Sequence, residues 1–127
     1  MARKLAAGEK PLFWVGASRE DLLKFPEEVK DEIGAALSVA QFGGKHRSAK
    51  PWKGEGSGVI EILENYMGDA YRAVYTVRFT NAVYVLHAFQ KKSHRGIQTG
   101  ARDVALISRR LKLAQQNYED RYGKQEN

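Results

Sequence analysis

Hydrophobic and polar residues alternate along three consecutive segments in the middle of the chain. These segments, residues 59–66, 70–79 and 82–91, each show the period-two pattern that is typical of a β-strand with two different faces. Turn-forming residues separate them, Gly-Asp at 68–69 and Thr-Asn at 80–81. The pattern therefore predicts an antiparallel meander of three strands.

The middle strand has two chemically different faces. Every second residue from Arg72 to Arg78 lies on a face of mixed polarity, whereas every second residue from Tyr71 to Phe79 is aromatic or aliphatic. We interpret the aromatic-rich face as the side that packs on the core.

The N-terminal part predicts a strand followed by two helices. Residues 12–17 are expected to form the strand, and Ser18 is expected to cap a short helix, with Asp21 completing a weak capping box. Pro26 is expected to start a second helix that spans residues 26–42, because proline is favoured at a helix start.

The rest of the chain completes the predicted architecture. Residues 43–58 are expected to form a loop, and residues 99–121 a last helix. The core positions expected on this helix are Val104, Ile107, Leu111, Ala114 and Tyr118. This order predicts an α+β fold in one domain, residues 1–127, with a basic N-terminal tail (1–10) and a polar C-terminal tail (119–127).

The net charge of +6 is concentrated in one region. Residues 86–112 contain seven Lys and Arg residues and a single acid, Asp103, so this segment carries as much net charge as the whole chain. A second basic group lies at residues 45–53. Such asymmetry favours a polyanion or an acidic protein as partner, although a charge run such as 102–112 is equally typical of a solvated helix face.

Composition excludes several classes of site. The absence of cysteine excludes disulfides and thiolate metal ligands, and the three histidines, His46, His87 and His94, have no ligand-like spacing. We therefore expect no metal and no cofactor, and we interpret His87 as a hydrogen-bonded core residue. Neither a membrane span nor a signal peptide is evident, so a cytoplasmic protein is expected.

The remaining chemistry is metal-free cleavage of RNA, in which the 2′-hydroxyl attacks the adjacent phosphate. This reaction needs a base, cations over the phosphorane and an acid for the leaving oxygen. Arg72 is the best candidate to hold the phosphate, because a strand-borne guanidinium is rigidly aimed; alternatively, it pairs with Glu61 across strands. Lys91 and Lys92 are candidates for charge or a proton, or protect a sheet edge, and His94 is a candidate for acid–base work.

Five segments together carry a family resemblance: KPLFWVG (10–16), FPEEVKDEIGAALSVAQFGGKH (25–46), AKPWKG (49–54), YRAVYTVRF (71–79) and VYVLHAFQKKS (83–93). With them the chain resembles the RelE/ParE toxin superfamily, and within it the HigB-like, phage-associated branch of type II toxin–antitoxin systems. The resemblance implies a microbial-RNase-like α+β fold and an endonuclease that cleaves mRNA, in many relatives on the ribosome. It also implies a cognate antitoxin, usually of helix-turn-helix type, in a hetero-oligomer with the toxin.

The resemblance also implies residue roles. Arg72 matches the arginine of the Tyr-Arg-x-Val-Tyr strand that contacts the scissile phosphate, and Lys53 matches the lysine of the Pro-x-Lys-Gly segment. Lys91 and Lys92 lie where the family has a basic residue at the end of the last strand. Four basic residues are candidates for RNA binding because of their charge, of which the resemblance supports Lys53 alone: Lys50, Lys53, Arg78 and Arg95.

The chain departs from the family pattern at the general base. Glu61 and Leu63 stand where some relatives carry two lysines, and Lys50 stands where others carry a glutamate. The base is therefore open between Glu61, Lys92 and His94. Two alternative functions stay open as well, a binding toxin with weak or no cleavage and a ParE-like inhibitor of DNA gyrase.

Overall fold

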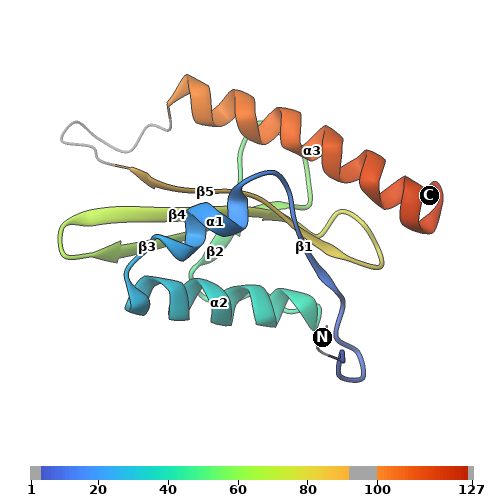
Figure 1. Cartoon of the computed structure of the whole chain (residues 1–127), viewed down its shortest axis with the longest axis horizontal. Helices are drawn as coiled ribbons and strands as arrows, with labels where there is room; N and C mark the ends of the chain where they lie inside the picture. The colour runs from blue at the N-terminus through green and yellow to red at the C-terminus, as the bar shows by residue number, and fades with distance from the viewer. Residues whose placement is uncertain (1–3, 92–99, 126–127) are drawn as a thin grey trace.

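A five-stranded sheet in the order β1-β5-β4-β3-β2 lies between helices on both of its faces (Figure 1). The computed structural model describes residues 4–91 and 100–125, with Lys91 described by its backbone alone. The strands are β1 (Leu12–Trp14), β2 (Ala49–Pro51), β3 (Val59–Tyr66), β4 (Asp69–Thr76) and β5 (Val83–Lys91), and the helices are α1 (Ser18–Leu23), α2 (Glu27–Gln41) and α3 (Ala101–Tyr122). The predicted α+β class is confirmed.

The predicted meander is formed by β3, β4 and β5, which pair antiparallel in sequence order. The first reversal is a two-residue turn at Met67 and Gly68, with φ angles of 50° and 86°. Positive φ at both central positions suits a tight hairpin, because the turn then follows the twist of the strands. The turn lies one residue before the predicted 68–69.

β4 ends at Thr76, three residues earlier than predicted. The Val77 backbone N–H and the Thr76 hydroxyl both donate to the Gly58 carbonyl, at 2.9 and 2.8 Å, so the chain turns toward the 55–58 loop here. Phe79 consequently leaves the strand alternation. It packs in the cluster that includes α3 rather than on the predicted aromatic face.

The predicted cap at Ser18 is wrong. β1 ends at Trp14, Gly16 has a φ of 56°, and Ala17 occupies the N-cap position of α1. Ser18 is the first helical residue, and its hydroxyl donates to the Val85 carbonyl of β5 at 3.2 Å. The side chain therefore ties α1 to the sheet instead of capping the helix.

Both faces of the sheet are buried, so the prediction of a single core face was incomplete. The helices α1 and α2 cover one face, and α2 begins at Glu27 with Pro26 as its N-cap, one residue later than predicted. Helix α3 covers the other face, where the buried members of its stripe are Ile107, Leu111, Ala114 and Tyr118. Val104, expected in this core, is instead 41% exposed.

Helix α3 has 22 residues and extends to Tyr122, so the predicted C-terminal tail begins inside the helix. In the part of the chain that the structure describes, no helix is long and apolar enough to cross a membrane.

The segment 43–58, predicted to be a loop, contains the short strand β2. It pairs antiparallel with β3 and sets Lys50 opposite Glu61. Pro51 is compatible with this strand because β2 is at the edge of the sheet. At an edge, a residue that lacks a backbone N–H need not interrupt the hydrogen bonds between strands. This edge carries Lys50, one of the predicted site residues.

Candidate functional site

A cavity of about 550 Å³ lies between β2, β3, β4 and the start of α3. Its lining residues are Lys50, Pro51, Trp52, Lys53, Glu61, Arg72 and Val104. Four residues predicted from the sequence therefore meet here: Lys50 on β2, Lys53 shortly after it, Glu61 on β3 and Arg72 on β4.

The sheet register explains this convergence. Lys50 on β2 is the direct partner of Glu61 on β3, and Arg72 on β4 is opposite Leu63, two residues further along β3. Arg72 and Glu61 are thus diagonal neighbours on the same face. Arg72 Nη1 donates to Glu61 Oε1 at 3.3 Å, and the side chains of the two residues are only 7% and 9% exposed.

The Glu61–Arg72 pair confirms the ion pair considered from the sequence, and it leaves the cavity positively charged. A buried guanidinium is costly without an opposite charge, so Glu61 offsets this cost and holds Arg72 in one orientation. Lys50 and Lys53 are exposed beside the pair. With three cations and one carboxylate around it, the cavity suits a phosphate group.

Arg78, predicted to bind RNA, is not brought to this cavity. Its guanidinium donates to the Ser57 carbonyl at 3.0 Å and to the Glu55 carbonyl, and it therefore holds the 55–58 loop against the end of β4. Arg78 lines a different, smaller cavity with Phe79. This position follows from the early end of β4.

Lys91 is the last residue of β5. The backbone of Lys91 pairs with Ala70, two residues from Arg72 on β4. Three predicted site residues lie outside the described residues: Lys92, His94 and Arg95. Their roles stay predictions.

Residues 20–112 match the family described as Phage derived protein Gp49-like (DUF891). The chain belongs to this family. The family is of the RelE/HigB-like toxin type, in line with the resemblance seen in the sequence. The match includes every residue that lines the cavity described above. No curated protein matches the chain.

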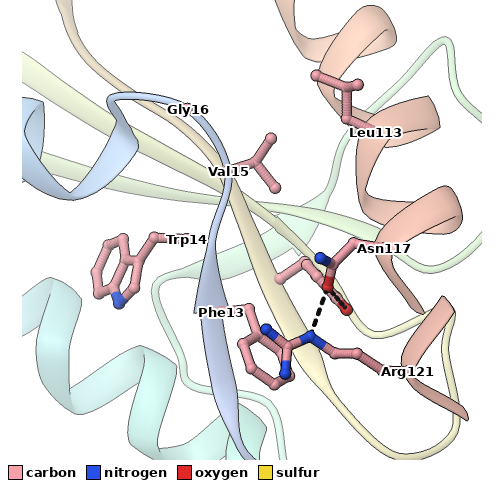
Figure 2. A pocket seen from close by; sticks show the side chains of 8 residues that line it. Phe13, Trp14, Val15, Gly16, Leu113, Asn117 and Arg121 are labelled. Atoms are coloured by element: carbon pink, nitrogen blue, oxygen red, sulfur yellow. Dashed lines mark hydrogen bonds between the residues drawn. The ribbon is translucent and has the colours of Figure 1, made fainter.

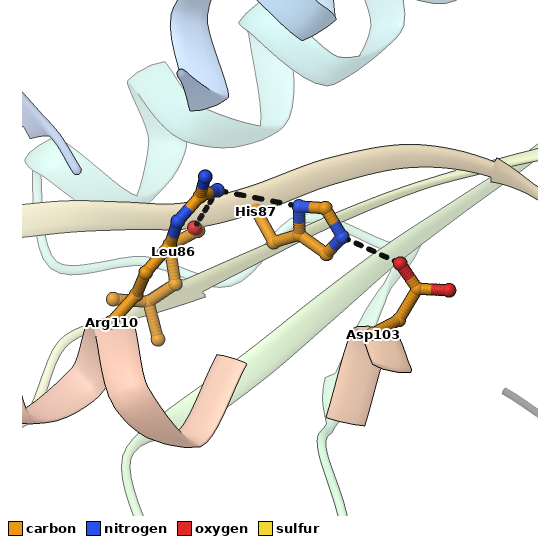
Figure 3. Close-up of polar contacts among 4 residues, drawn as sticks. All are labelled: Leu86, His87, Asp103 and Arg110. Carbon is orange, nitrogen blue, oxygen red and sulfur yellow. Dashed lines mark hydrogen bonds and ion pairs between the residues drawn. The ribbon is translucent and has the colours of Figure 1, made fainter. Parts of the chain in front are cut away.

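A polar network that sequence reasoning missed fixes α3 of this Gp49-like protein against β5 (Figure 3). His87 Nε2 lies 2.8 Å from Asp103 Oδ1, and His87 Nδ1 lies 3.4 Å from Arg110 Nη1. The same Arg110 nitrogen donates to the Leu86 carbonyl at 3.0 Å. The ring of His87 stacks on Phe89, with 4.6 Å between the ring centroids.

The network determines the tautomer of His87. A guanidinium can only donate, so Nδ1 accepts and the ring proton of the neutral form sits on Nε2, from which it is donated to Asp103. The interpretation of His87 as a hydrogen-bonded core residue is thus confirmed. Asp103 had one sequence signal, because it is the single acid in the basic stretch 86–112.

A second cavity, of about 340 Å³, lies between β1 and the C-terminal half of α3 (Figure 2). Arg121 stacks over Phe13 at 4.2 Å, and Asn117 Oδ1 accepts hydrogen bonds from Arg121 Nε and the Tyr84 hydroxyl. Burial raises the pKa of Tyr84, so this hydroxyl stays protonated as a donor. The described residues around this cavity include none of the predicted site residues.

Within residues 4–91 and 100–125, no three histidine or acidic side chains gather as the ligands of a metal ion would.

Proposed function

We propose that this Gp49-like protein is the toxin of a type II toxin–antitoxin system and that it cleaves mRNA. The observation that carries the proposal is the cavity in which buried Arg72 and Glu61 meet the exposed Lys50 and Lys53. Membership of a RelE/HigB-like toxin family supports the toxin role. A fixed guanidinium with ammonium groups around it suits the phosphates of an RNA backbone.

The proposed reaction is a metal-independent transesterification. The 2′-oxygen of one nucleotide forms a bond to the adjacent phosphorus, and the bond from phosphorus to the 5′-oxygen of the next nucleotide breaks. The products are a 2′,3′-cyclic phosphate and a free 5′-hydroxyl. Arg72 binds the phosphate and stabilises the charge that develops on the phosphorane.

Glu61 is the base in this proposal. The 2′-hydroxyl and the phosphate that it attacks belong to the same nucleotide, so the base and the phosphate ligand must be neighbours. Glu61 Oε1 and Arg72 Nη1, 3.3 Å apart, meet this condition. A phosphate that binds Arg72 competes with the Glu61 carboxylate for the guanidinium. The carboxylate is then free to take the proton of the 2′-hydroxyl.

The proton for the leaving 5′-oxygen comes from an ammonium group at the cavity. Lys50 and Lys53 are both exposed there. Lysine donates a proton well when phosphate binding places its ammonium next to the developing oxyanion. Single Lys→Met substitutions at Lys50 and at Lys53 identify the donor. Loss of the proton donor is expected to slow cleavage of RNA with an ordinary 5′-leaving group more than loss of a charge that only binds phosphate.

The proposed partners follow from the toxin role. The substrate is mRNA, on the ribosome, and a cognate antitoxin neutralises the toxin in a cytoplasmic hetero-oligomer. The net charge of +6 favours an acidic antitoxin surface, and we place that surface over the basic cavity.

Expression in growing cells tests this function. We expect induction of the wild-type chain to stop growth and to produce new 5′ ends inside translated mRNAs. Arg72→Ala is expected to remove both effects, whereas Lys24→Ala, an equal loss of charge at an exposed position on the other face, keeps them. Growth arrest with intact mRNA and impaired DNA supercoiling would indicate a gyrase inhibitor instead.

A further inference from the structure

One side of the cavity is apolar. Pro51, Trp52 and Val104 line it together with the charged residues. Trp52 is only 6% exposed and packs in the cluster that includes α3, so its indole is held in place. Val104 is 41% exposed, although it belongs to the same helical stripe as Ile107, which is fully buried. Helix α3 therefore leaves an apolar side chain uncovered where it meets the cavity.

An apolar wall next to phosphate-binding cations matches the two halves of a nucleotide. A nucleobase is planar and apolar on both faces, and contact with aromatic side chains stabilises any of the four bases. The phosphate on the same ribose needs cations, which Arg72, Lys50 and Lys53 supply. The volume of about 550 Å³ is within the range of small-molecule sites.

We propose that Pro51, Trp52 and Val104 form a subsite for the nucleobase next to the phosphate that Arg72 binds. This inference rests on the proposed function, because it names how RNA occupies the same cavity. Asp103 directly precedes Val104, and its hydrogen bond to His87 fixes the start of α3. The apolar wall is thus rigid before RNA arrives, and its shape sets which bases fit best.

Tryptophan fluorescence tests the subsite directly. The chain has two tryptophans, so a Trp14→Phe background leaves Trp52 as the reporter. Adenosine 5′-monophosphate is compared with ribose 5-phosphate, which carries the same phosphate on the sugar without a base. We expect the nucleotide to change the Trp52 emission and to bind about tenfold more tightly. Equal affinities, or an unchanged emission, would overturn the proposal.

Two exposed residues of α3 form a matched pair of variants. Val104 lines this cavity, and Leu113 lines the cavity between β1 and the C-terminal half of α3; the two residues are 41% and 52% exposed. Val104→Ala is expected to weaken nucleotide binding about three- to fivefold without changing ribose 5-phosphate binding, and Leu113→Ala to change neither. An equal loss of nucleotide affinity in both variants, or no loss in either, would contradict the subsite.

RNA cleavage separates the subsite from the proposed function. If Val104→Ala weakens base-dependent binding but the protein cleaves no RNA, the subsite is supported and the nuclease function is excluded. If Arg72→Ala abolishes cleavage but the wild type binds the two probes with equal affinity, the nuclease function is supported and the subsite is excluded.

Discussion

Arg72 Nη1 and Glu61 Oε1 lie 3.3 Å apart, although the register sets Arg72 opposite Leu63 and Glu61 opposite Val74. The contact is therefore diagonal across two strands, and it is made on the face that α3 only partly covers at Val104. A structural ion pair and a phosphate site are compatible here, because the pair both orients the guanidinium and places a carboxylate beside it.

Substitutions of Glu61 separate its charge from its packing. Glu61→Ala leaves the buried Arg72 without this carboxylate and is expected to destabilise the fold by about 3–5 kcal/mol. Glu61→Gln keeps the shape and an acceptor oxygen, so it should lower stability less while slowing RNA cleavage about 10²- to 10⁴-fold. Urea denaturation and single-turnover cleavage measure the two effects. A Glu61→Gln variant that cleaves at the wild-type rate would exclude Glu61 as the base.

The tautomer of His87 is a prediction that NMR can check. Nitrogen chemical shifts of the neutral ring should show a protonated Nε2 and an unprotonated Nδ1, because Arg110 donates to Nδ1. Asp103→Asn should lower stability by only about 1 kcal/mol, since Asp103 is one-third exposed. A protonated Nδ1 in the neutral ring would contradict the network.

The stability of the fold should fall at high pH because of Tyr75. Burial raises the pKa of Tyr75 to about 12. The unfolded chain releases this proton near pH 10, whereas the folded chain retains it, so folding loses about 2–3 kcal/mol between pH 10 and 12. Thermal unfolding of the wild type and of Tyr75→Phe at pH 8 to 11.5 measures this loss. An equally steep decline in both proteins would show that Tyr75 does not cause it.

The sheet was predictable where the sequence alternates. The three meander strands and the start of α2 after Pro26 follow from local pattern, and this was sufficient to bring Glu61 near Arg72. The strand β2 was not predictable, because three residues that include a proline show no alternation. Its pairing with β3 is what delivers Lys50 to the cavity.

Long-range contacts account for the other differences. Ser18 suits an N-cap locally, but the Val85 carbonyl across the fold takes its hydrogen bond. Arg78 shares the strand period of Arg72, but the Gly58 carbonyl ends β4 at Thr76 and redirects it. The pairing of Asp103 with His87 depends on how α3 lies on β5, which no local pattern specifies.

Cleavage of RNA by the purified protein tests the central claim most directly. A labelled RNA is incubated without divalent metal, and a translated mRNA is incubated with ribosomes, each with wild type, Arg72→Ala and Lys24→Ala. We predict fragments that end in a 2′,3′-cyclic phosphate from wild type and Lys24→Ala, and a rate reduced at least about 100-fold for folded Arg72→Ala. Equal cleavage by Arg72→Ala, or intact RNA with wild type on both substrates, would contradict the assignment of this cavity as a nuclease site.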